Sequence, residues 1–588
     1  MSLDLQNAPS IPALLRQHAA DLADHEAVTL VRDAGPTTLS YALLDRASRA
    51  VAAWLQARFS PGERVLLLYP VGLDFVPAFL GCLYAGMIAV PAPMPGGHLQ
   101  QRRRVDAIAH DAGIAAVFTD SANLADVSDW LTAHGRAALP GIATDVDALG
   151  DPDAWQMPAI DRRTVMLLQY TSGSTGDPKG VMVGHGNLLH NAGAFTRGLG
   201  LGPNTRFGGW IPMYHDMGLL AQLMPGLLLG SSVTLMTPQT FIMRPHLWLR
   251  MIDRHDLQFS AAPNFAYELC QRRITDAQIG ELDLSRWTHA ANGSEPVQSS
   301  TLLGFARRFA AAGFRAEALA PCYGMAEATV YISGRAGRPP CLRTLDAERL
   351  ARDRFVLADG KAATRPIVGC GTAADYDVRI VDPATGHSLR AGEIGEIWLR
   401  GPSVAHGYWH RPDATAATFQ AITDDGQGGY LRTGDLGTVV DGEIYITGRH
   451  KEMLIVHGRN LYPQDIEHEV RLQHPELATR LGAVFSVAPP DEEEAVVVTH
   501  ELAGKHPEER MRELAFAIKS TVSREFGVRV AGVVLLRPGA VERTTSGKIR
   551  RAAMRERFLA NELDALHESL EPALHALRPP RAAGAAAS

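Results

Sequence analysis

The chain has 588 residues, of which 46% are hydrophobic and 21% charged, and its formal net charge at pH 7 is -7. This balance predicts a globular protein of two or more domains with a sizeable core, and the acidic excess argues against a nucleic-acid-binding protein. The five cysteines show neither CxxC spacing nor paired histidines, so we expect free thiols in a cytoplasmic protein rather than disulfides or a zinc site.

The first 92 residues raise the question of targeting or membrane insertion. Residues 1–28 lack the basic-then-apolar order of a signal peptide and predict a short amphipathic helix. Residues 71–92 (VGLDFVPAFLGCLYAGMIAVPA) are long enough to span a bilayer, but Asp74, Pro77 and three glycines interrupt the run. We therefore expect a buried helix that leads into a buried strand, with no stable membrane insertion.

Short apolar runs recur between helix-length segments in the first part of the chain. They are RVLLLYP near 64, AAVFTD near 115, TVMLLQYT near 164 and SSVTLMTP near 231. Such runs are typical of parallel strands covered by helices on both faces in an α/β layered domain. From about residue 375, turn-bounded segments such as DYDVRIVD and GEIGEIWLRG instead predict an antiparallel sheet.

The pattern changes again near residue 450, into a compact alternation of strands and helices. Apolar residues at steps of four mark one helix face, namely Leu514, Ile518, Val522 and Phe526, and AGVVLLRP predicts a following strand. We place a boundary at residues 449–452. The predicted fold class is α/β, with layered α/β subdomains and a small β-barrel-like subdomain in residues 1–450 (changing near 370), an α+β domain in 451–575, and a disordered tail in 576–588.

A loop rich in glycine and hydroxyl groups lies at residues 168–182 (LQYTSGSTGDPKGVM). Glycines let backbone N–H groups turn toward an anion, hydroxyls add donors, and Lys179 supplies a positive charge, so this segment predicts a phosphate cradle. It is not the P-loop of nucleoside triphosphatases, because Pro178 and Gly180 stand where that motif needs a glycine and a hydroxyl.

The same loop resembles the signature of the adenylate-forming enzymes, which include acyl-CoA synthetases, peptide-synthetase adenylation domains and luciferases. Six further segments match that family in order: WIPMYHDMGLL (210–220), NGSEPV (292–297), CYGMAEATV (322–330), YLRTGDLG (430–437), ITGRHKEMLI (446–455) and RTTSGKIRR (543–551). The resemblance covers nearly the whole chain. It implies an ATP-dependent ligase that joins a carboxylate to the α-phosphate of ATP and releases pyrophosphate.

The resemblance also assigns roles to individual residues. It implies Mg²⁺ at Glu327 and Thr175, the ribose at Asp435, and the adenine at NGSEPV and Tyr323. The implied catalytic residues are Lys179, His215, Glu327 and Lys548, the last on a mobile C-terminal domain with Lys451 as the hinge candidate. The implied nucleotide-binding residues are Thr171, Ser172, Gly173, Ser174, Thr175, Gly176, Asn292, Gly293, Ser294, Glu295, Tyr323, Gly324, Met325, Ala326, Asp435 and Arg449.

Three stretches resemble the fatty acyl-AMP ligase branch of this family. They are residues 238–269, residues 457–467 (HGRNLYPQDIE) and an insertion at about 335–365. This resemblance implies that the insertion restricts closure into the CoA-using arrangement, and that a fatty acid, expected to be long-chain, passes as its adenylate to an acyl carrier protein of a polyketide or nonribosomal peptide synthase. Two alternatives stay open: a fatty acyl-CoA synthetase, and a catalytically dead nucleotide-binding or scaffold protein.

Two basic segments could meet an acidic carrier protein. QRRRV (101–105) and RRAAMRERF (550–558) are the candidates for a docking face by electrostatic steering. The apolar segments FIMRPHLWL (241–249) and LLAQLMPGLLLG (219–230) suit the wall of a tunnel for an alkyl chain, and plain core packing would give the same composition.

Overall fold

The computed structural model describes residues 4–96, 99–146, 149–171, 178–360, 363–456, 459–488, 494–544 and 547–580. Within these ranges no helix combines the length and the apolar character needed to cross a membrane. The run at residues 71–92 folds as predicted, with a buried helix, α3 (Phe75–Tyr84), that leads into a buried strand, β4 (Ile88–Ala92).

Two sheets form the large N-terminal part, and parallel pairing dominates both, as predicted. Only the partners at their edges, β2, β8 and β14, pair antiparallel. The eight-stranded sheet has the order β14 (Ser333–Gly334), β13 (Leu319–Tyr323), β12 (His289–Asn292), β11 (Phe259–Ala262), β9 (Phe207–Gly209), β10 (Val233–Leu235), β1 (Glu26–Arg32), β2 (Gly35–Ser40). The six-stranded sheet has the order β6 (Gly141–Ala143), β5 (Ala116–Thr119), β3 (Arg64–Leu68), β4, β7 (Val165–Thr171), β8 (Lys179–Gly184).

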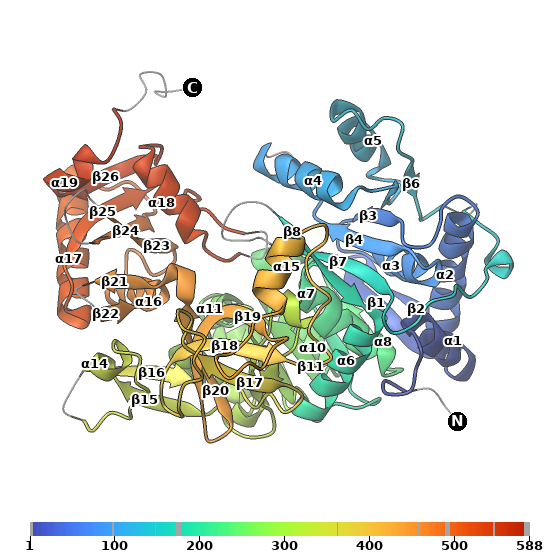
Figure 1. Cartoon of the computed structure of the whole chain (residues 1–588), viewed down its shortest axis with the longest axis horizontal. Helices are drawn as coiled ribbons and strands as arrows, with labels where there is room; N and C mark the ends of the chain where they lie inside the picture. Colours follow the sequence, from blue (N-terminus) through green and yellow to red (C-terminus); the bar gives the residue numbers. More distant parts are fainter. Residues whose placement is uncertain are drawn as a thin grey trace.

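Helices cover these sheets (Figure 1), and most of them share one large hydrophobic core with the sheets. The two helices within residues 99–133 instead pack with the six-stranded sheet in a second core. The helices of this part are α1 (Ile11–Asp21), α2 (Tyr41–Gln56), α3, α4 (Leu99–Ala112), α5 (Leu124–Ala133), α6 (His185–Leu199), α7 (Asp216–Gly218), α8 (Met224–Leu228), α9 (Pro238–Met243), α10 (His246–Arg254), α11 (Asn264–Arg273), α12 (Asp276–Ile279) and α13 (Ser299–Phe309). A π-helix at Leu219–Leu223 joins α7 to α8 without a break, so residues 216–228 form one helical stretch.

A smaller subdomain follows, built from antiparallel strands as predicted. Its main sheet has the order β17 (Asp377–Val381), β18 (Gly395–Arg400), β19 (Leu431–Val440), β20 (Glu443–Arg449), with α15 (Pro412–Phe419) beside it. The segment predicted as an insertion forms a hairpin, β15 (Leu342–Asp346) and β16 (Thr364–Val368), with α14 (Ala347–Leu350) between them. A bridge between Gly369 and Tyr445 joins this hairpin to β20.

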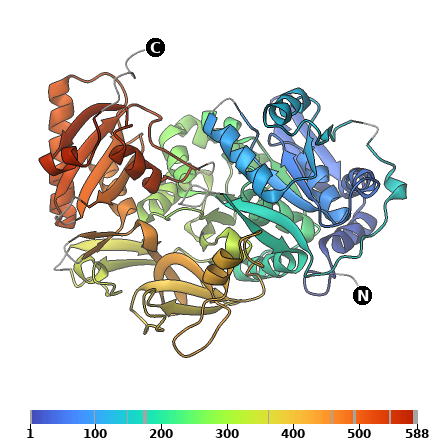
Figure 2. The same cartoon turned by 45° about the horizontal axis from the view of Figure 1, so that its top comes forward.

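The C-terminal part forms a separate lobe (Figure 2). It contains β21 (Leu454–Val456), β22 (Arg459–Leu461), α16 (Pro463–Gln473), β23 (Gly482–Val487), β24 (Ala495–Glu501), α17 (Glu508–Phe526), β25 (Val530–Leu536), α18 (Arg551–Leu559), β26 (Ala565–Leu570) and α19 (Pro572–Ala576). The apolar face predicted for α17 is buried. The expected tail starts later than residue 576, because the Arg578 side chain is held by an ion pair with Glu568; residues 581–588 lie outside the described part.

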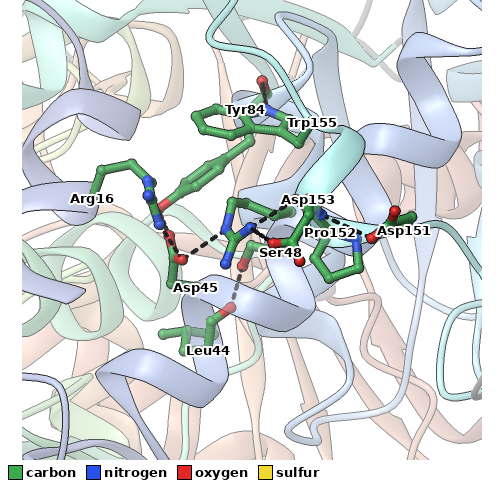
Figure 3. Close-up of polar contacts among 10 residues, drawn as sticks. Arg16, Leu44, Asp45, Ser48, Tyr84, Asp151, Pro152, Asp153 and Trp155 are labelled. Atoms are coloured by element: carbon green, nitrogen blue, oxygen red, sulfur yellow. Dashed lines mark hydrogen bonds and ion pairs between the residues drawn. The ribbon is translucent and has the colours of Figure 1, made fainter. Parts of the chain in front are cut away.

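A buried cluster of charges joins the N-terminal helices (Figure 3). Asp45 on α2 is 6% exposed, pairs with Arg16 and Arg49, and accepts a hydrogen bond of 3.1 Å from the Tyr84 hydroxyl. Arg49 also donates to the carbonyl of Pro152. These ion pairs and hydrogen bonds connect α1, α2, α3 and the segment near residue 152. We therefore interpret the cluster as a structural element that holds these segments together rather than as a second site.

Candidate active site

The two ends of the predicted phosphate loop lie on paired antiparallel strands. Thr171 at the end of β7 lies opposite Lys179 at the start of β8, so the intervening segment must leave and return at one place. A Cβ at residue 180 would lie 2.9 Å from the Tyr170 ring, which explains the glycine after Lys179. The rest of the predicted cradle lies outside the described residues: Ser172, Gly173, Ser174, Thr175 and Gly176.

Lys179 and Glu327 meet through Tyr408. The Lys179 ammonium group lies 4.9 Å from the centre of the Tyr408 ring, a cation–π contact, and the Tyr408 hydroxyl donates to Glu327 Oε1 at 2.8 Å. Burial raises the pKa of Glu327, although the hydrogen bond from Tyr408 opposes the rise. The carboxylate is thus held in a place where a bound cation would favour its charged form.

A strained turn presents Glu327. Residue 324 must be glycine, because a Cβ there would lie 1.8 Å from the Val330 carbonyl oxygen. Thr329 has a positive φ of 68°, and its hydroxyl donates to the Ser403 carbonyl at 2.7 Å. Such backbone strain persists where the surrounding structure fixes it, and it is common at functional sites. Met325 and Ala326, which precede Glu327, pack against the large core.

Asp435 is buried between two polar partners. The Tyr323 hydroxyl donates to Asp435 Oδ2 at 2.8 Å, and Arg449 Nε donates to Asp435 Oδ1 at 3.1 Å. Asp435 and Arg449 lie opposite each other on β19 and β20, so strand register positions the pair. The negative charge of Asp435 is the main cause of the raised pKa of Arg449, which keeps the guanidinium charged.

The NGSEPV segment follows β12 and lies beside α11. Asn292 is fully buried, Ser294 has a positive φ of 70°, and a Cβ on Gly293 would lie 2.9 Å from the Cys322 carbonyl oxygen. Glu295 accepts a hydrogen bond of 2.6 Å from the backbone N–H of Phe265. These constraints hold the segment against β13, the strand that carries Tyr323.

His215 caps the helical stretch that starts at Asp216. Its Nδ1 lies 2.8 Å from Asp216 Oδ1 and accepts from the backbone N–H of Met217. Burial alone would raise the pKa of Asp216, but its interactions with His215 and the charge of Lys548 outweigh that effect and lower the pKa. Asp216 therefore stays a carboxylate at neutral pH, close to the C-terminal lysine.

Lys548 reaches this site from the C-terminal part. Its loop is a small hairpin in which the backbone N–H of Lys548 donates to Thr544 Oγ1, and a Cβ on Gly547 would lie 3.9 Å from Phe265. Burial, followed by the charge of Arg449, lowers the pKa of Lys548, while Asp216, Asp435 and Glu295 act in the opposite direction. Its ammonium group forms neither a hydrogen bond nor an ion pair with any residue that the structure describes.

The described residues of the predicted site thus lie together: Lys179, Glu327, Tyr323, Asp435, Arg449, Glu295, His215 and Lys548. Tyr408 is the residue that the sequence analysis missed. It lies in HGYWH, just before α15, and no pattern there indicates that it links a lysine to a carboxylate 81 positions away.

The buried Glu295 carboxyl should make the stability of the protein depend on pH. Burial raises its pKa to about 7, so the folded protein binds this proton more tightly than the unfolded chain. The free energy of unfolding should therefore fall as the pH rises toward about 7, when the buried carboxyl must ionise. We expect Glu295→Gln to weaken this loss, so that between about pH 5 and about pH 8 its unfolding temperature falls less than that of the wild type. Parallel curves for the two proteins would contradict this assignment.

Two family models match the chain. The model described as AMP-binding enzyme matches residues 15–409, and the model described as Disco-interacting protein 2-like, AMP domain, matches residues 451–568. The medium-chain-fatty-acid–[acyl-carrier-protein] ligase JamA of Moorena producens is 40% identical over 537 residues, which cover 90% of this chain and 91% of that protein.

Solved structures are similar over the same length. A fatty acyl-adenylate ligase from L. pneumophila, in complex with acyl adenylate and pyrophosphate, has a TM-score of 0.74 at 34% identity and covers 96% of this chain and 98% of its own. A structure from studies of fatty acyl-adenylate ligases from E. coli and L. pneumophila has a TM-score of 0.84 at 32% identity, covering 94% and 98%. These matches confirm the predicted fold class.

Proposed function

The chain belongs to the AMP-binding enzyme family, and on this basis we propose that it activates a fatty acid with ATP and passes the acyl group to an acyl carrier protein. In the first step a carboxylate oxygen bonds to the α-phosphorus of ATP, and the bond from that phosphorus to the leaving pyrophosphate breaks. In the second step the thiol sulfur of a phosphopantetheine arm bonds to the acyl carbon, and AMP leaves. JamA is named for these two partners, a medium-chain fatty acid and an acyl carrier protein.

The position of Lys548 is the observation that carries this proposal. A lysine from the C-terminal part, unpaired among the described residues, lies within electrostatic reach of Asp216 and Asp435 on the large part. Joining a carboxylate to ATP brings two anions together, so a positioned cation lowers the main electrostatic cost. A protein that only bound a nucleotide would not need such a lysine, which argues against a scaffold role.

The remaining side chains divide between nucleotide and acid. We assign the ribose to Asp435, which Tyr323 and Arg449 orient, and the adenine to the NGSEPV segment. The triphosphate then lies toward Lys179 and the loop that follows Thr171. We assign the acid carboxylate to His215 and Asp216, where it would point toward Lys548, whose charge helps to lower the pKa of Asp216.

Glu327 fits Mg²⁺. Hard oxygen ligands suit this ion, and Tyr408 is the one described side chain that donates to the Glu327 carboxylate. No three acidic, histidine or cysteine side chains gather into a metal site within the described part of the chain, so further ligands would have to come from phosphate oxygens and from Thr175. When bound, the ion would polarise phosphoryl oxygens.

The acyl chain would extend from His215 along the helical stretch that follows. We call residues 219–230 the acyl wall; its residues 219–228 are all buried and, except for Gln222, all apolar. The second candidate segment contributes less, because Ile242 and Met243 are 44% and 60% exposed, while Phe241 and Trp248 are buried. Each methylene buried against the wall would contribute about 0.8 kcal/mol.

The insertion hairpin contacts the C-terminal part directly. The backbone N–H and the side-chain amide of Asn460 donate to the Ala351 carbonyl and to Asp353, respectively, at 2.9 and 2.7 Å. Arg365 lies 3.5 Å from Asp465 and 4.5 Å from the centre of the Phe526 ring. These contacts hold the C-terminal part where Lys548 reaches the site. Because they would restrict its movement into the CoA-using arrangement, they support a carrier protein rather than CoA as acyl acceptor.

The carrier would dock on the basic face beside α4, but Arg551 does not belong to that face. Arg551 is bound to Glu467 and Glu452, so its charge is used inside the C-terminal part. Arg103 on α4 is exposed and belongs to the face. Burial is the main cause of the lowered pKa of Arg104, and the nearby charge of Arg550 is the second, so Arg550 lies close to α4.

Reversing the charge of Arg103 should weaken carrier docking. We expect Arg103→Glu to slow acyl transfer by about tenfold at low salt, with adenylate formation unchanged, because a rim charge acts mainly on the association rate. Arg163→Glu, another exposed arginine outside both basic segments, is the matched control. Equal losses in both half-reactions would argue against a docking role.

The product distribution tests the whole proposal. The purified protein is incubated with MgATP and fatty acids of graded length, with either CoA or a phosphopantetheine-loaded carrier protein, and the acyl product is identified by mass. We expect acyl-carrier product and little acyl-CoA. Predominant acyl-CoA would instead identify a CoA synthetase, and the absence of pyrophosphate release with every acid would overturn the assignment. We place this reaction in the cytoplasm, where the five free cysteines would stay reduced.

A further inference from the structure

Gln222 is a fully buried amide in the acyl wall, and the role argued for it rests on the proposed function. Its exposed fraction is 0%, and neither its Oε1 nor its Nε2 has a hydrogen-bond partner among the described residues. A buried polar group without a partner costs about 1 to 3 kcal/mol, and such groups are rare in folded proteins. An apolar side chain at this position would avoid the cost, so the amide calls for a partner that binds there.

The backbone is shaped around this amide. A Cβ built on Gly209 would lie 2.1 Å from Gln222 Oε1 and 2.9 Å from Nε2, so the end of β9 meets the amide only because residue 209 is glycine. Gln222 also lies in the π-helix at Leu219–Leu223, and single π-turns inside α-helices often occur at functional sites. The glycine and the π-turn are independent features that both concern this one side chain.

The position of Gln222 relative to the catalytic end sets what it could contact. It lies seven residues after His215 on a continuous helical stretch, which corresponds to about 10 Å along the axis. His215 and Asp216 lie at the carboxylate end, close to Lys548. An acyl chain that follows this helix would therefore pass Gln222 well before its end.

We propose that Gln222 is a specificity-determining residue that recognises a hydroxyl group on the acyl chain, about 10 Å from the carboxylate. A hydroxyl matches the amide because it accepts from Nε2 and donates to Oε1 at once. The substrate class is thus a hydroxylated fatty acid rather than a plain alkyl acid. A plain chain would leave both amide atoms unpaired, and sites built to bond a substrate hydroxyl discriminate strongly against analogues that lack it.

Adenylate formation with a positional series tests this role. Fatty acids of one length, plain or with one hydroxyl at successive carbons, are compared by kcat/KM for pyrophosphate release. We expect the wild type to prefer one positional isomer over the plain acid by about tenfold or more. Gln222→Leu should abolish that preference, mainly by improving the plain acid, and should not lower the unfolding temperature, because it removes an unpaired buried amide.

Controls separate this role from a buried amide that only binds water. Thr119→Val removes another fully buried polar atom without a described partner, in the other sheet, and should keep the wild-type preference. Gln222→Met, which is unbranched, replaces the leucine variant if that one unfolds. A wild type that favours no hydroxylated isomer, or a Gln222 variant with an unchanged ratio, overturns the inference. Activity on plain acids in either case leaves the proposed function standing, whereas no activity on any acid overturns that function.

Discussion

Lys548→Ala should reduce acyl-adenylate formation by about 10²- to 10³-fold, which is the usual effect of removing one preorganised charged donor. The reason is the environment of the ammonium group: it is buried near Asp216 and Asp435 and, among the described residues, has no partner that would replace it. Pyrophosphate release with saturating MgATP measures this half-reaction. The effect should appear mainly in kcat, because the charge that Lys548 stabilises is greatest in the transition state.

The second half-reaction distinguishes catalysis from folding. When chemically prepared acyl adenylate is supplied, we expect Lys548→Ala to transfer the acyl group to the carrier at nearly the wild-type rate. Arg543→Ala is the matched control, since Arg543 lies on the same hairpin with an exposed side chain. If the lysine variant lost both half-reactions equally, Lys548 would be a structural residue of the hairpin.

Much of the fold could be predicted because its signals are local. The apolar runs of β3, β5, β7 and β10 are continuous, as expected for strands covered on both faces, and Leu514 to Phe526 repeat at helical spacing. The extent of the C-terminal part was harder to predict. Arg578, which follows α19, is paired with Glu568 on β26, and an alanine- and proline-rich segment gives no sign of this pairing.

In the candidate site, too, contacts within a strand pair could be predicted from the sequence, whereas long-range contacts could not. Asp435 and Arg449 could be expected to lie together, because a strand pair brings RTGDLG against TGR in one register. Tyr408 could not, because its role depends on a long-range contact between a loop and the strained turn at Glu327. The sequence predicts Arg551 on a basic surface, but the structure pairs it with Glu467 and Glu452, which lie 84 and 99 positions earlier in the chain.

Gln222 is a polar residue whose role the apolar pattern of its segment does not predict. Composition predicts a tunnel wall or plain core packing for residues 219–230, and the structure buries residues 219–228 as either would require. Only the coordinates show that its single amide has no described partner, because hydrogen-bond satisfaction depends on every neighbour. The sequence therefore predicts the wall, whereas the substrate preference has to be read from one unpaired side chain within it.

Glu327→Gln should have the other large effect, a loss of adenylate formation of about 10²-fold or more with a higher Mg²⁺ concentration needed for half-maximal rate. The substitution keeps the shape of the side chain and its hydrogen bond with Tyr408, but it removes the negative charge whose burial raises the pKa of Glu327. Tyr408→Phe removes only the donor and should cost about two- to tenfold.

Measuring the rate against Mg²⁺ separates a metal ligand from a structural carboxylate. A ligand variant should regain part of its rate at high Mg²⁺, since mass action compensates for weaker binding, whereas a structural defect would leave the Mg²⁺ dependence unchanged. Glu317→Gln, an exposed glutamate that precedes β13, is the control and should behave as the wild type. An unchanged half-saturating Mg²⁺ concentration in Glu327→Gln would show that Glu327 is not a metal ligand. Its role would then be to position Tyr408, whose ring contacts the Lys179 ammonium group.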